Sequence, residues 1–400
     1  MTNKPDLPVP APLRGTDAGT FTEYTIKQRF PNIARRVLTE NKLTAVAVAR
    51  MEALLAEIPY GEIRPLTDTH APDFTQWQNW IAPYAGQNWL QPPWFFAETC
   101  FYRRIIEAVD YFATGFDPFT YQKEQGLERH SEAIFALCQQ LARSLVNGWQ
   151  PSQFSHWLLA DLWGNQVDLS MWSVDDASKP SHSSDAVRLA HTLVDDRAAV
   201  LALLNKLENI RVDFIVDNAG LELVSDLVLA DYLLTTGKAG TIHFYVKLHP
   251  TFVSDATTHD VLQTLVYLNG RPQSNIQALA DRLTGYMVDG RFHPVTHPFW
   301  TSPLPLWQMP DELRQELAPA HLIISKGDAN YRRALGDAHW PTDTPFQQIV
   351  SYLPAPALFL RTCKSEVIAG LPPGQAEALA EQEPDWLVNG KWGLIQFTHP

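Results

Sequence analysis

The stretch RVDFIVDNAGLELVSDLVLADYLL, residues 211 to 234, decides the fold class. Residues 211–216 are mostly apolar and predict a buried strand, which ends at Asp217 and Asn218. Gly220 then predicts a turn, and the apolar residues of 222–234 recur at the three- and four-residue spacing of a helix. Strand, turn and helix in this order form the first part of a βαβ unit.

The same alternation continues to the end of the chain. Further strands are predicted at TIHFYVK (241–247), HLIIS (321–325) and ALFLR (357–361), with a helix at 260–268 after the first of them. Alternating strands and helices favour a mostly parallel sheet, because parallel strands need crossover connections. We expect an α/β protein whose residues 206–400 form an α/β/α sandwich with a Rossmann-like sheet.

The preceding part of the chain has a different pattern. Residues 21–205 contain apolar residues mainly at helical spacing, which predicts an α-helical domain covering the site. Residues 1–20 are rich in proline and polar residues and are expected to form a flexible arm.

Composition excludes several classes of protein. The net charge is −13 and no cluster of Lys and Arg offsets it, so binding to nucleic acid or to an anionic membrane is not expected. The three cysteines lack CxxC spacing, which favours a reducing compartment and argues against structural zinc. The N-terminus lacks the apolar core of a signal peptide, and no run approaches 18 apolar residues. We expect a cytoplasmic protein, and the sequence leaves its oligomeric state open.

Polar side chains follow each of the four predicted strands. Because parallel strands end at one edge of a sheet, these residues are expected to converge there. A single polar strand end is explained by a turn, but four in succession indicate a site. The residues concerned are Asp217, Asn218 and Glu222 after the first strand, Asp255 after the second, Lys326, Asp328, Asn330, Tyr331 and Arg332 after the third, and Arg361 and Lys364 at the fourth.

Two kinds of chemistry are combined in this set. Asp217, Asn218 and Asp255 supply hard oxygen ligands of the kind that Mg²⁺, Mn²⁺ or a similar divalent cation prefers. The lysines and arginines of the third and fourth strand ends are the groups that neutralise a phosphoryl group. Neither a Walker loop nor a GxGxxG loop is found at the relevant positions. Hydrolysis of a phosphate monoester is the simplest reaction that fits.

The motifs VDNAGLELVSDLVLADYLL (216–234), FVSDATTHDV (252–261), KGDANYRR (326–333) and RTCK (361–364) together resemble the damage-control phosphatase family, formerly a domain of unknown function. The RTxK element is similar to that of its third subfamily, also described as protein-glutamate O-methyltransferase-like. The likeness extends to WFFAETCFYRR (94–104) and LWGNQVDLSMW (162–172), and so from about residue 20 to the end.

The resemblance implies a phosphatase that requires Mn²⁺, Co²⁺, Ni²⁺ or Mg²⁺ and acts on phosphometabolites such as fructose 1-phosphate or fructose 6-phosphate. It implies a helical N-terminal part and an α/β/α sandwich. Asp217, Asn218 and Asp255 would hold the metal, and the stretch Asp328–Arg332 with Lys364 would hold the substrate. Glu222 lies where a methyl-donor contact has been proposed in the subfamily.

Several alternatives stay open at this stage. The attacking group is either a metal-bound water or Asp217 itself, and Asn165 either caps a turn or reaches the sugar. Glu98, on an aromatic-rich helix, belongs either to a buried ion pair or to the substrate site. Methyl transfer from S-adenosylmethionine to a protein carboxylate and a non-catalytic sugar-phosphate sensor are the other functions considered. The absence of a glycine-rich loop after a strand disfavours the methyltransferase.

Overall fold

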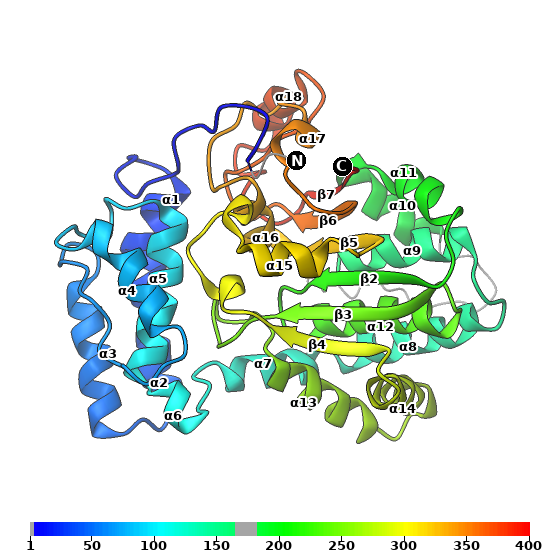
Figure 1. Cartoon of the computed structure of the whole chain (residues 1–400), viewed down its shortest axis with the longest axis horizontal. Helices are drawn as coiled ribbons and strands as arrows, with labels where there is room; N and C mark the ends of the chain where they lie inside the picture. The colour runs from blue at the N-terminus through cyan, green and yellow to red at the C-terminus, as the bar shows by residue number, and fades with distance from the viewer. Residues whose placement is uncertain (1–3, 165–181) are drawn as a thin grey trace.

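A seven-stranded sheet forms the centre of the protein, in the strand order β1-β7-β6-β5-β2-β3-β4 (Figure 1). The computed structural model describes residues 4–164 and 182–400. Strands β2 to β6 are parallel, β7 is antiparallel to β6, and β1 is parallel to β7. The strands are β1 (Thr192–Asp195), β2 (Ile210–Ile215), β3 (Ala239–Val246), β4 (Phe292–Thr296), β5 (Leu322–Lys326), β6 (Ala357–Thr362) and β7 (Gly393–Thr398).

The expected α/β fold is confirmed, and the four predicted strands are β2, β3, β5 and β6. They are neighbours in the sheet, and β2 lies between β5 and β3, where the order of the chain through the sheet reverses. Such a switch point leaves a crevice beyond the carboxyl ends of the two strands.

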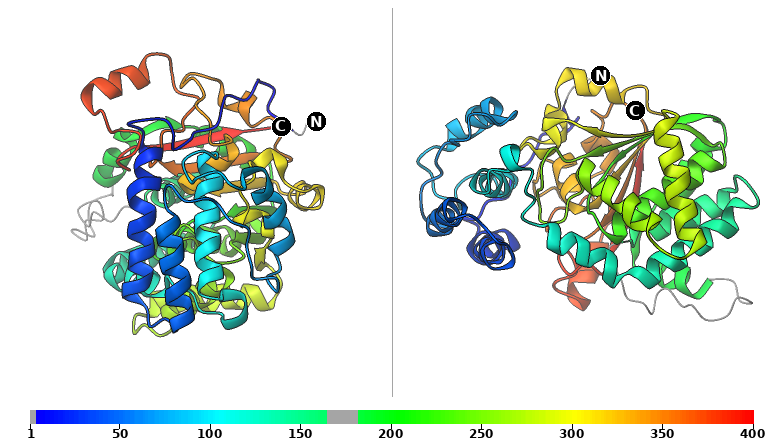
Figure 2. Two further views of the ribbon diagram at one scale, coloured as in Figure 1. Left: turned by 90° about the vertical axis from the view of Figure 1, so that its left-hand side faces the viewer. Right: turned by 90° about the horizontal axis from the view of Figure 1, so that it is seen from below.

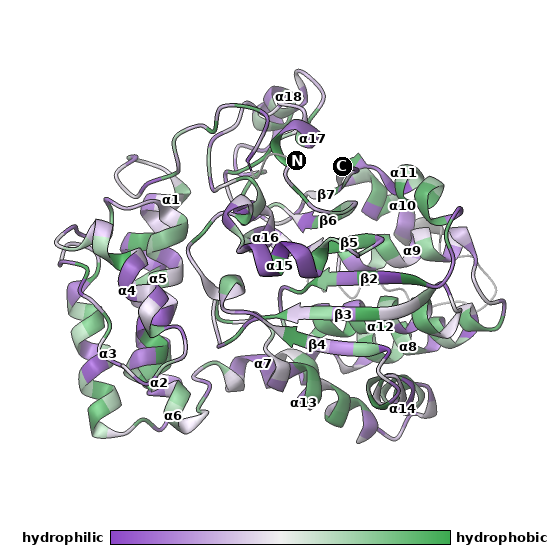
Figure 3. Ribbon diagram, in the orientation of Figure 1, coloured by the Kyte–Doolittle hydropathy of each residue, from purple (hydrophilic) through white to green (hydrophobic). Residues whose placement is uncertain are grey.

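Helices cover both faces of the sheet. In Figure 1, α8, α9 and α12 lie behind it, while α15 and α16 lie in front. Figure 3 shows α15 mainly in the colour of hydrophilic residues, as its sequence DELRQEL requires at a surface. The helices of this part are α7 (Thr120–Arg129), α8 (Ser131–Leu145), α9 (Pro151–Leu162), α10 (His182–Ala190), α11 (Arg197–Leu204), α12 (Leu221–Thr235), α13 (Thr258–Asn269), α14 (Ser274–Val288), η4 (Pro298–Thr301), η5 (Leu306–Gln308), α15 (Asp311–Leu317), α16 (Gly327–Ala334), α17 (Phe346–Ile349) and α18 (Gln375–Gln382).

A separate helical unit faces the carboxyl ends of the parallel strands, and its long helices lie side by side (Figure 2). Its central helix, α5, is buried along its whole length, which explains its aromatic-rich sequence. The elements of this unit are α1 (Phe21–Tyr24), the π-helix η1 (Thr25–Arg29), α2 (Phe30–Glu40), α3 (Ala45–Glu57), α4 (Phe74–Ile81), η2 (Ala82–Tyr84), α5 (Trp94–Ala108) and α6 (Tyr111–Thr114).

The structure divides the chain at a different point from the expected boundary at residues 205–206. Helices α8 and α9 pack on α12 and share its apolar core, and β1 is a strand of the sheet. These elements therefore belong with the sheet, and the helical unit facing the site ends at α6. Helical periodicity identified the helices but carried no information about which body each one packs against.

The N-terminal arm is packed against the protein and is not a free tail over residues 4–20. Leu13 is 1% exposed, and its N–H donates to the Asp337 carbonyl at 2.9 Å. Its own carbonyl accepts from Trp94 N–H at 2.8 Å. The arm thus joins α5 of the helical unit to the segment after α16, which a proline-rich composition does not predict.

Candidate active site

The register of the sheet brings three strand ends together. Ile215 of β2 is aligned with Tyr245 of β3 and with Ser325 of β5. Two residues further along each chain come Asp217, Lys247 and Gly327. Alternation along a strand places residues two apart on the same side, so these three positions lie together at the edge of the sheet.

Glycine at position 327 permits a close approach between β5 and the end of β2. Its φ is +82°, a conformation that favours glycine, and a Cβ there would lie 1.9 Å from Asp217 Oδ2. Gly327 begins α16, so the N-terminus of this eight-residue helix lies beside Asp217. The backbone N–H groups of a first helical turn have no partners within the helix and attract anions.

A cavity of about 240 Å³ opens at this edge. The sheet side contributes the strand ends and the first turn of α16, and the helical unit contributes the opposite wall. The residues that line it are Phe21, Arg29, Trp94, Glu98, Tyr102, Leu162, Asp217, Asn218, Glu222, Phe252, Ser254, Asp255, Gly327, Asp328, Ala329, Arg332, Leu360, Thr362 and Lys364.

The three expected metal ligands are brought together in this cavity. Asn218 and Asp255 pair as an isolated antiparallel bridge, and Ala256 N–H donates to the Asp217 carbonyl at 2.7 Å. The side-chain amide of Asn218 donates to Asp217 Oδ2 at 2.7 Å, and its oxygen accepts from Ser254 Oγ at 2.5 Å. These contacts fix the oxygen-bearing side chains of two strand ends against each other.

Negative charge is concentrated in this group. Burial, together with Asp255 and Glu222, raises the pKa of Asp217 well above its usual value. Burial likewise raises the pKa of Asp255 to about 6, although Lys247 opposes the shift at 3.2 Å. In the absence of a cation, the site therefore disfavours full ionisation of its carboxylates.

The donor set fits a divalent cation that prefers oxygen ligands. Asp217 Oδ1 is buried and has no hydrogen-bond partner among the described residues, although it faces a polar cavity. Across residues 4–164 and 182–400, no group of three His, Cys, Asp or Glu side chains is arranged to hold a metal. The candidate set differs because its third member, Asn218, contributes an amide oxygen, which suits Mg²⁺ or Mn²⁺ and not Zn²⁺.

The opposite side of the cavity carries a lysine whose ammonium group has no hydrogen bond or ion pair to the described residues. This residue, Lys364, is half-buried. Its backbone N–H donates to Asp328 Oδ1 at 3.2 Å, as does Ser365 Oγ at 3.0 Å. Asp328 thus fixes the RTCK turn while Lys364 points a free charge at the site.

Lys326 lies behind the cavity wall and does not reach the cavity. Its ammonium group donates to Asp161 Oδ1 at 2.7 Å and lies 3.0 Å from Asp226 Oδ1 and 3.8 Å from Glu222 Oε1. Glu222 in turn accepts from the Asn218 amide at 2.9 Å. The structure therefore differs from the expected substrate contact, and Lys326 holds Glu222 and, through it, Asn218 in place.

Three further expected substrate contacts also lie outside the cavity. Asn330 donates to the Val216 and Lys326 carbonyls and accepts from Lys247 at 3.2 Å. The Tyr331 hydroxyl donates to Gln396, and Arg361 donates to Asp328 and to the backbone of residues 365 and 367. Their polar groups are occupied within the protein, so they support the strand ends. Asn165 lies outside the described residues.

Arg332 lines the cavity but is committed to internal ion pairs. It donates to Glu98 Oε2 at 2.6 Å and to Asp337 Oδ1 at 2.8 Å, and its guanidinium lies 3.5 Å from the centre of the Trp94 ring. Of the alternatives left open for Glu98, the buried ion pair is present; Glu98 also lines the cavity, and its contact with a substrate stays a prediction.

Sequence reasoning missed Lys247 and the aromatic residues of the helical wall. Lys247 is 1% exposed and pairs with Asp255, and a lysine directly at the end of the predicted strand TIHFYVK was the available signal. Trp94, Tyr102 and Phe252 carried no such signal, because aromatic residues on a buried helix or loop are equally typical of a core.

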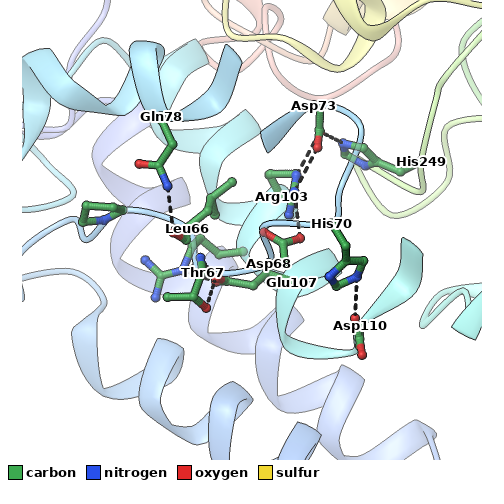
Figure 4. Close-up of polar contacts among 12 residues, drawn as sticks. Leu66, Thr67, Asp68, His70, Asp73, Gln78, Arg103, Glu107, Asp110 and His249 are labelled. Carbon is green, nitrogen blue, oxygen red and sulfur yellow. Dashed lines mark hydrogen bonds and ion pairs between the residues drawn. The ribbon is translucent and has the colours of Figure 1, made fainter. Parts of the chain in front are cut away.

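The helical unit contains a buried polar network that His249 of the sheet domain approaches (Figure 4). Arg103 of α5 donates two hydrogen bonds to Asp73, both at 2.9 Å, and forms an ion pair with Asp68 at 2.8 Å. His249, in the loop that leads from β3 to Asp255, approaches Asp73 to 3.7 Å. Asp73 thus lies between Arg103 of α5 and the loop that carries Asp255, and among the described residues its carboxylate accepts hydrogen bonds only from Arg103.

Fold and site define an α/β protein with a cavity between the carboxyl edge of a mostly parallel sheet and a covering helical unit. Residues 25–379 match the model of the damage-control phosphatase ARMT1-like domain. The chain belongs to this family, and the resemblance noted from its motifs is confirmed.

Curated relatives cover the same length. The chain is 34% identical to the damage-control phosphatase ARMT1 of Mus musculus over 434 residues, covering 98% of this chain and 99% of the mouse protein. Identity to the Homo sapiens protein of the same name is 33%, with the same coverage. A crystal structure of a DUF89 family protein from Pyrococcus horikoshii aligns with a TM-score of 0.48 and 15% identity over 93% of this chain and 97% of that one. Within the described part of the chain, no helix has both the length and the apolar character needed to cross a membrane.

Proposed function

We propose that the protein is a divalent-metal-dependent hydrolase of the phosphate monoesters of small metabolites, with fructose 1-phosphate and fructose 6-phosphate as candidate substrates. The observation that carries the proposal is the cavity in which Asp217, Asn218 and Asp255 face the N-terminus of α16 and Lys364. Family membership supports phosphatase chemistry of this general kind.

The divalent cation is assigned to the side chains of Asp217, Asn218 and Asp255. When bound there, Mn²⁺, Co²⁺, Ni²⁺ or Mg²⁺ would supply a Lewis acid that polarises the phosphoryl oxygens. Lys247 stays paired with Asp255 and fixes the direction of that carboxylate.

The phosphoryl group is assigned to the opposite side of the cavity. The N–H groups of the first turn of α16 donate to its oxygens, and Lys364 neutralises part of its charge. Asp328 and Arg361 act indirectly, since their mutual hydrogen bond of 2.8 Å holds the turn that carries Lys364. The helical unit covers the cavity and limits access of bulk water.

Two attacking groups suit this arrangement, a water molecule and the Asp217 carboxylate. Attack by Asp217 would transfer the phosphoryl group to its oxygen and release the alcohol, and water would then cleave the acyl phosphate. Acid quenching during turnover of a ³²P-labelled ester distinguishes the two, because only attack by Asp217 leaves label on the protein.

The test of the proposal is a metal-dependent assay. The purified protein is treated with EDTA and supplied separately with Mn²⁺, Co²⁺, Ni²⁺ and Mg²⁺, with fructose 1-phosphate, fructose 6-phosphate and 4-nitrophenyl phosphate as substrates. We expect no turnover in EDTA and recovery with at least one metal. Turnover that survives EDTA, or no turnover with any metal, contradicts the proposal and favours a non-catalytic sensor.

Lys364 provides a sharper version of this test. Lys364→Ala removes a cation that has no structural partner, so it should raise KM about tenfold or more at little cost in stability. Lys391→Ala is the matched control, because Lys391 is exposed, pairs with Glu383 and lies outside the cavity. Equal kinetics in the two variants would remove Lys364 from the site.

Methyl transfer gains no support from the cavity. Its volume of about 240 Å³ is below the range typical of sites for drug-sized ligands such as S-adenosylmethionine. Glu222 is the residue associated with a methyl donor, and its Oε2 already accepts a hydrogen bond of 2.9 Å from the Asn218 amide. Calorimetry with millimolar S-adenosylmethionine tests this alternative, and a measurable heat of binding would revive it.

A further inference from the structure

A further wall of the cavity, separate from the metal ligands and from Lys364, comes from the helical unit. The strand arrows of β2, β3 and β4 point toward this unit in Figure 1. The view from below in Figure 2 also shows the helical unit as a separate body beside the sheet. Three polar side chains of this wall line the cavity, namely Arg29 at the end of η1 and Glu98 and Tyr102 on α5. None of them belongs to the groups assigned above to metal or phosphate.

Arg29 is presented by an unusual piece of backbone. The π-helix Thr25–Arg29 interrupts the otherwise α-helical run from α1 to α2. π-Helical segments are rare, and those that do occur are frequently found at functional sites. The extra residue in the turn changes the direction in which the neighbouring side chains point. The last residue of this π-helix, Arg29, lines the cavity.

Arg29 is exposed, and its guanidinium has no ion pair or hydrogen bond within the described part of the chain. Lys27, by contrast, pairs with Glu23, and Arg36 pairs with Glu40. It lies 5.3 Å from the centre of the Phe21 ring, which supports the side chain without using its N–H donors. Arg29 therefore has donors available for a ligand.

Glu98 and Tyr102 are also incompletely paired. They are four residues apart on α5 and therefore share one face of the helix. Glu98 is 7% exposed and uses only Oε2, toward Arg332, while the hydroxyl of Tyr102, 3% exposed, has no hydrogen bond to the described residues. Burial raises the pKa of Tyr102, Glu98 raises it further and Arg29 lowers it, so both charges act on this hydroxyl.

The combination of groups identifies the chemistry of a ligand. A hydroxyl group donates one hydrogen bond and accepts others, so it can satisfy the free oxygen of Glu98 and the donors of Arg29 together. A second anionic group would be repelled by Glu98, and an apolar group would cover the polar groups of Glu98 and Tyr102 without offering them partners. A carbon chain bearing several hydroxyl groups meets these requirements.

We propose that Arg29, Glu98 and Tyr102 recognise the hydroxyl-bearing chain of the substrate, at the end away from the phosphoryl group, and determine specificity for polyol or sugar phosphates. This inference rests on the proposed function, because it assigns the phosphoryl group to the α16 side of the same cavity. Phe252, whose ring centre lies 5.4 Å from that of Tyr102, completes the wall.

The experiment compares two substrates in the presence of saturating Mn²⁺. Fructose 1-phosphate carries the hydroxyl groups, and 4-nitrophenyl phosphate does not. The quantity measured is the ratio of kcat/KM for the sugar phosphate to kcat/KM for the aryl phosphate. Arg29→Gln and Tyr102→Phe should each lower this ratio about tenfold, the scale of one or two lost hydrogen bonds.

Arg35→Gln is the matched control, since it removes the same charge from an exposed position on α2 that does not line the cavity. Its ratio should equal that of the wild type, and Arg29→Lys should recover part of the ratio lost in Arg29→Gln. The thermal midpoint of each variant shows that it is folded.

The outcomes separate this inference from the proposed function. If the wild type hydrolyses neither substrate with any metal, the proposed function fails and the inference fails with it. If the wild type hydrolyses only the aryl phosphate, or if the variants keep the wild-type ratio, the inference is overturned while the phosphatase assignment stands. An equal loss on both substrates also overturns it, because the wall would then act on the phosphoryl group or on folding.

Discussion

Substitution of Asp217 by Asn tests whether this residue holds a metal or only forms a turn, because asparagine keeps the shape and turn preference of aspartate. Asp217 is 5% exposed, and its Oδ1 has no hydrogen-bond partner among the described residues. Burial and the charges of Asp255 and Glu222 raise its pKa, so the ionised carboxylate destabilises the metal-free fold. No cation is within ion-pair distance of it in the described part of the chain, so the substitution leaves no charge unpaired.

The expected size of the effect follows from these neighbours. An unpaired buried polar group costs about 1–3 kcal/mol, and we expect the free energy of unfolding in EDTA to rise by about that amount when the carboxylate is replaced by a neutral amide. For a chain of 400 residues the unfolding entropy is about 0.8 kcal/mol/K, so the thermal midpoint should rise by about 1–4 °C. Turnover at saturating Mn²⁺ should fall at least about a hundredfold, because an anionic ligand is lost.

Asp213→Asn is the matched control on the same strand. Asp213 is fully buried but accepts two hydrogen bonds of 2.8 Å from Arg211, so its substitution should lower the thermal midpoint. Differential scanning fluorimetry with and without Mn²⁺, beside turnover of the same samples, gives both readouts. The reasoning is refuted if Asp217→Asn keeps turnover within about threefold of the wild type and its midpoint still rises on addition of Mn²⁺.

Two further predictions concern stability, and a third concerns metal binding. In EDTA, the free energy of unfolding should fall as the pH rises from about 4 to about 6. The pKa of Asp255 is raised from 3.8 in the unfolded chain to about 6 in the fold, so the folded state binds the proton more tightly than the unfolded state does. Urea midpoints across this range measure the fall, and a flat profile contradicts it. Gly327→Ala should abolish Mn²⁺ binding in calorimetry, because its Cβ would collide with Asp217, and wild-type affinity would disprove this. Arg103→Gln should lower the free energy of unfolding by about 3–5 kcal/mol in urea titrations, whereas the exposed control Arg36→Gln should change it by less than about 0.5 kcal/mol.

The central strands could be predicted from the sequence because they are buried on both faces and therefore almost continuously apolar. Strands β1, β4 and β7 are edge or antiparallel strands and lack this signature. The segment of β4, Phe292–Thr296, contains Pro294, which disfavours a strand prediction although it is tolerated at an edge. The boundary of the helical unit was missed because periodicity describes one helix and not its packing partners.

The motifs located the site, but not every residue within a motif faces the cavity. In KGDANYRR, Asp328 and Arg332 are four residues apart and face the cavity, whereas Asn330 and Tyr331 lie on other faces of α16. Lys326 is the last residue of β5, and its side chain points to the opposite face of the sheet from the position of Gly327. Helical and strand periodicity applied inside the motif would have separated these residues, but the wall formed by the helical unit depends on long-range packing that spacing rules do not describe.

The packed arm has a practical consequence for protein engineering. A truncated polypeptide beginning at Phe21 would lose Leu13 and the backbone hydrogen bonds that connect it to Trp94 and to Asp337. Both of those residues contact Arg332 at the cavity wall. Trimming the proline-rich N-terminus, a common step when crystals or higher yields are sought, would therefore disturb the wall of the cavity. An affinity tag joined through a flexible spacer, with the arm kept whole, avoids this damage.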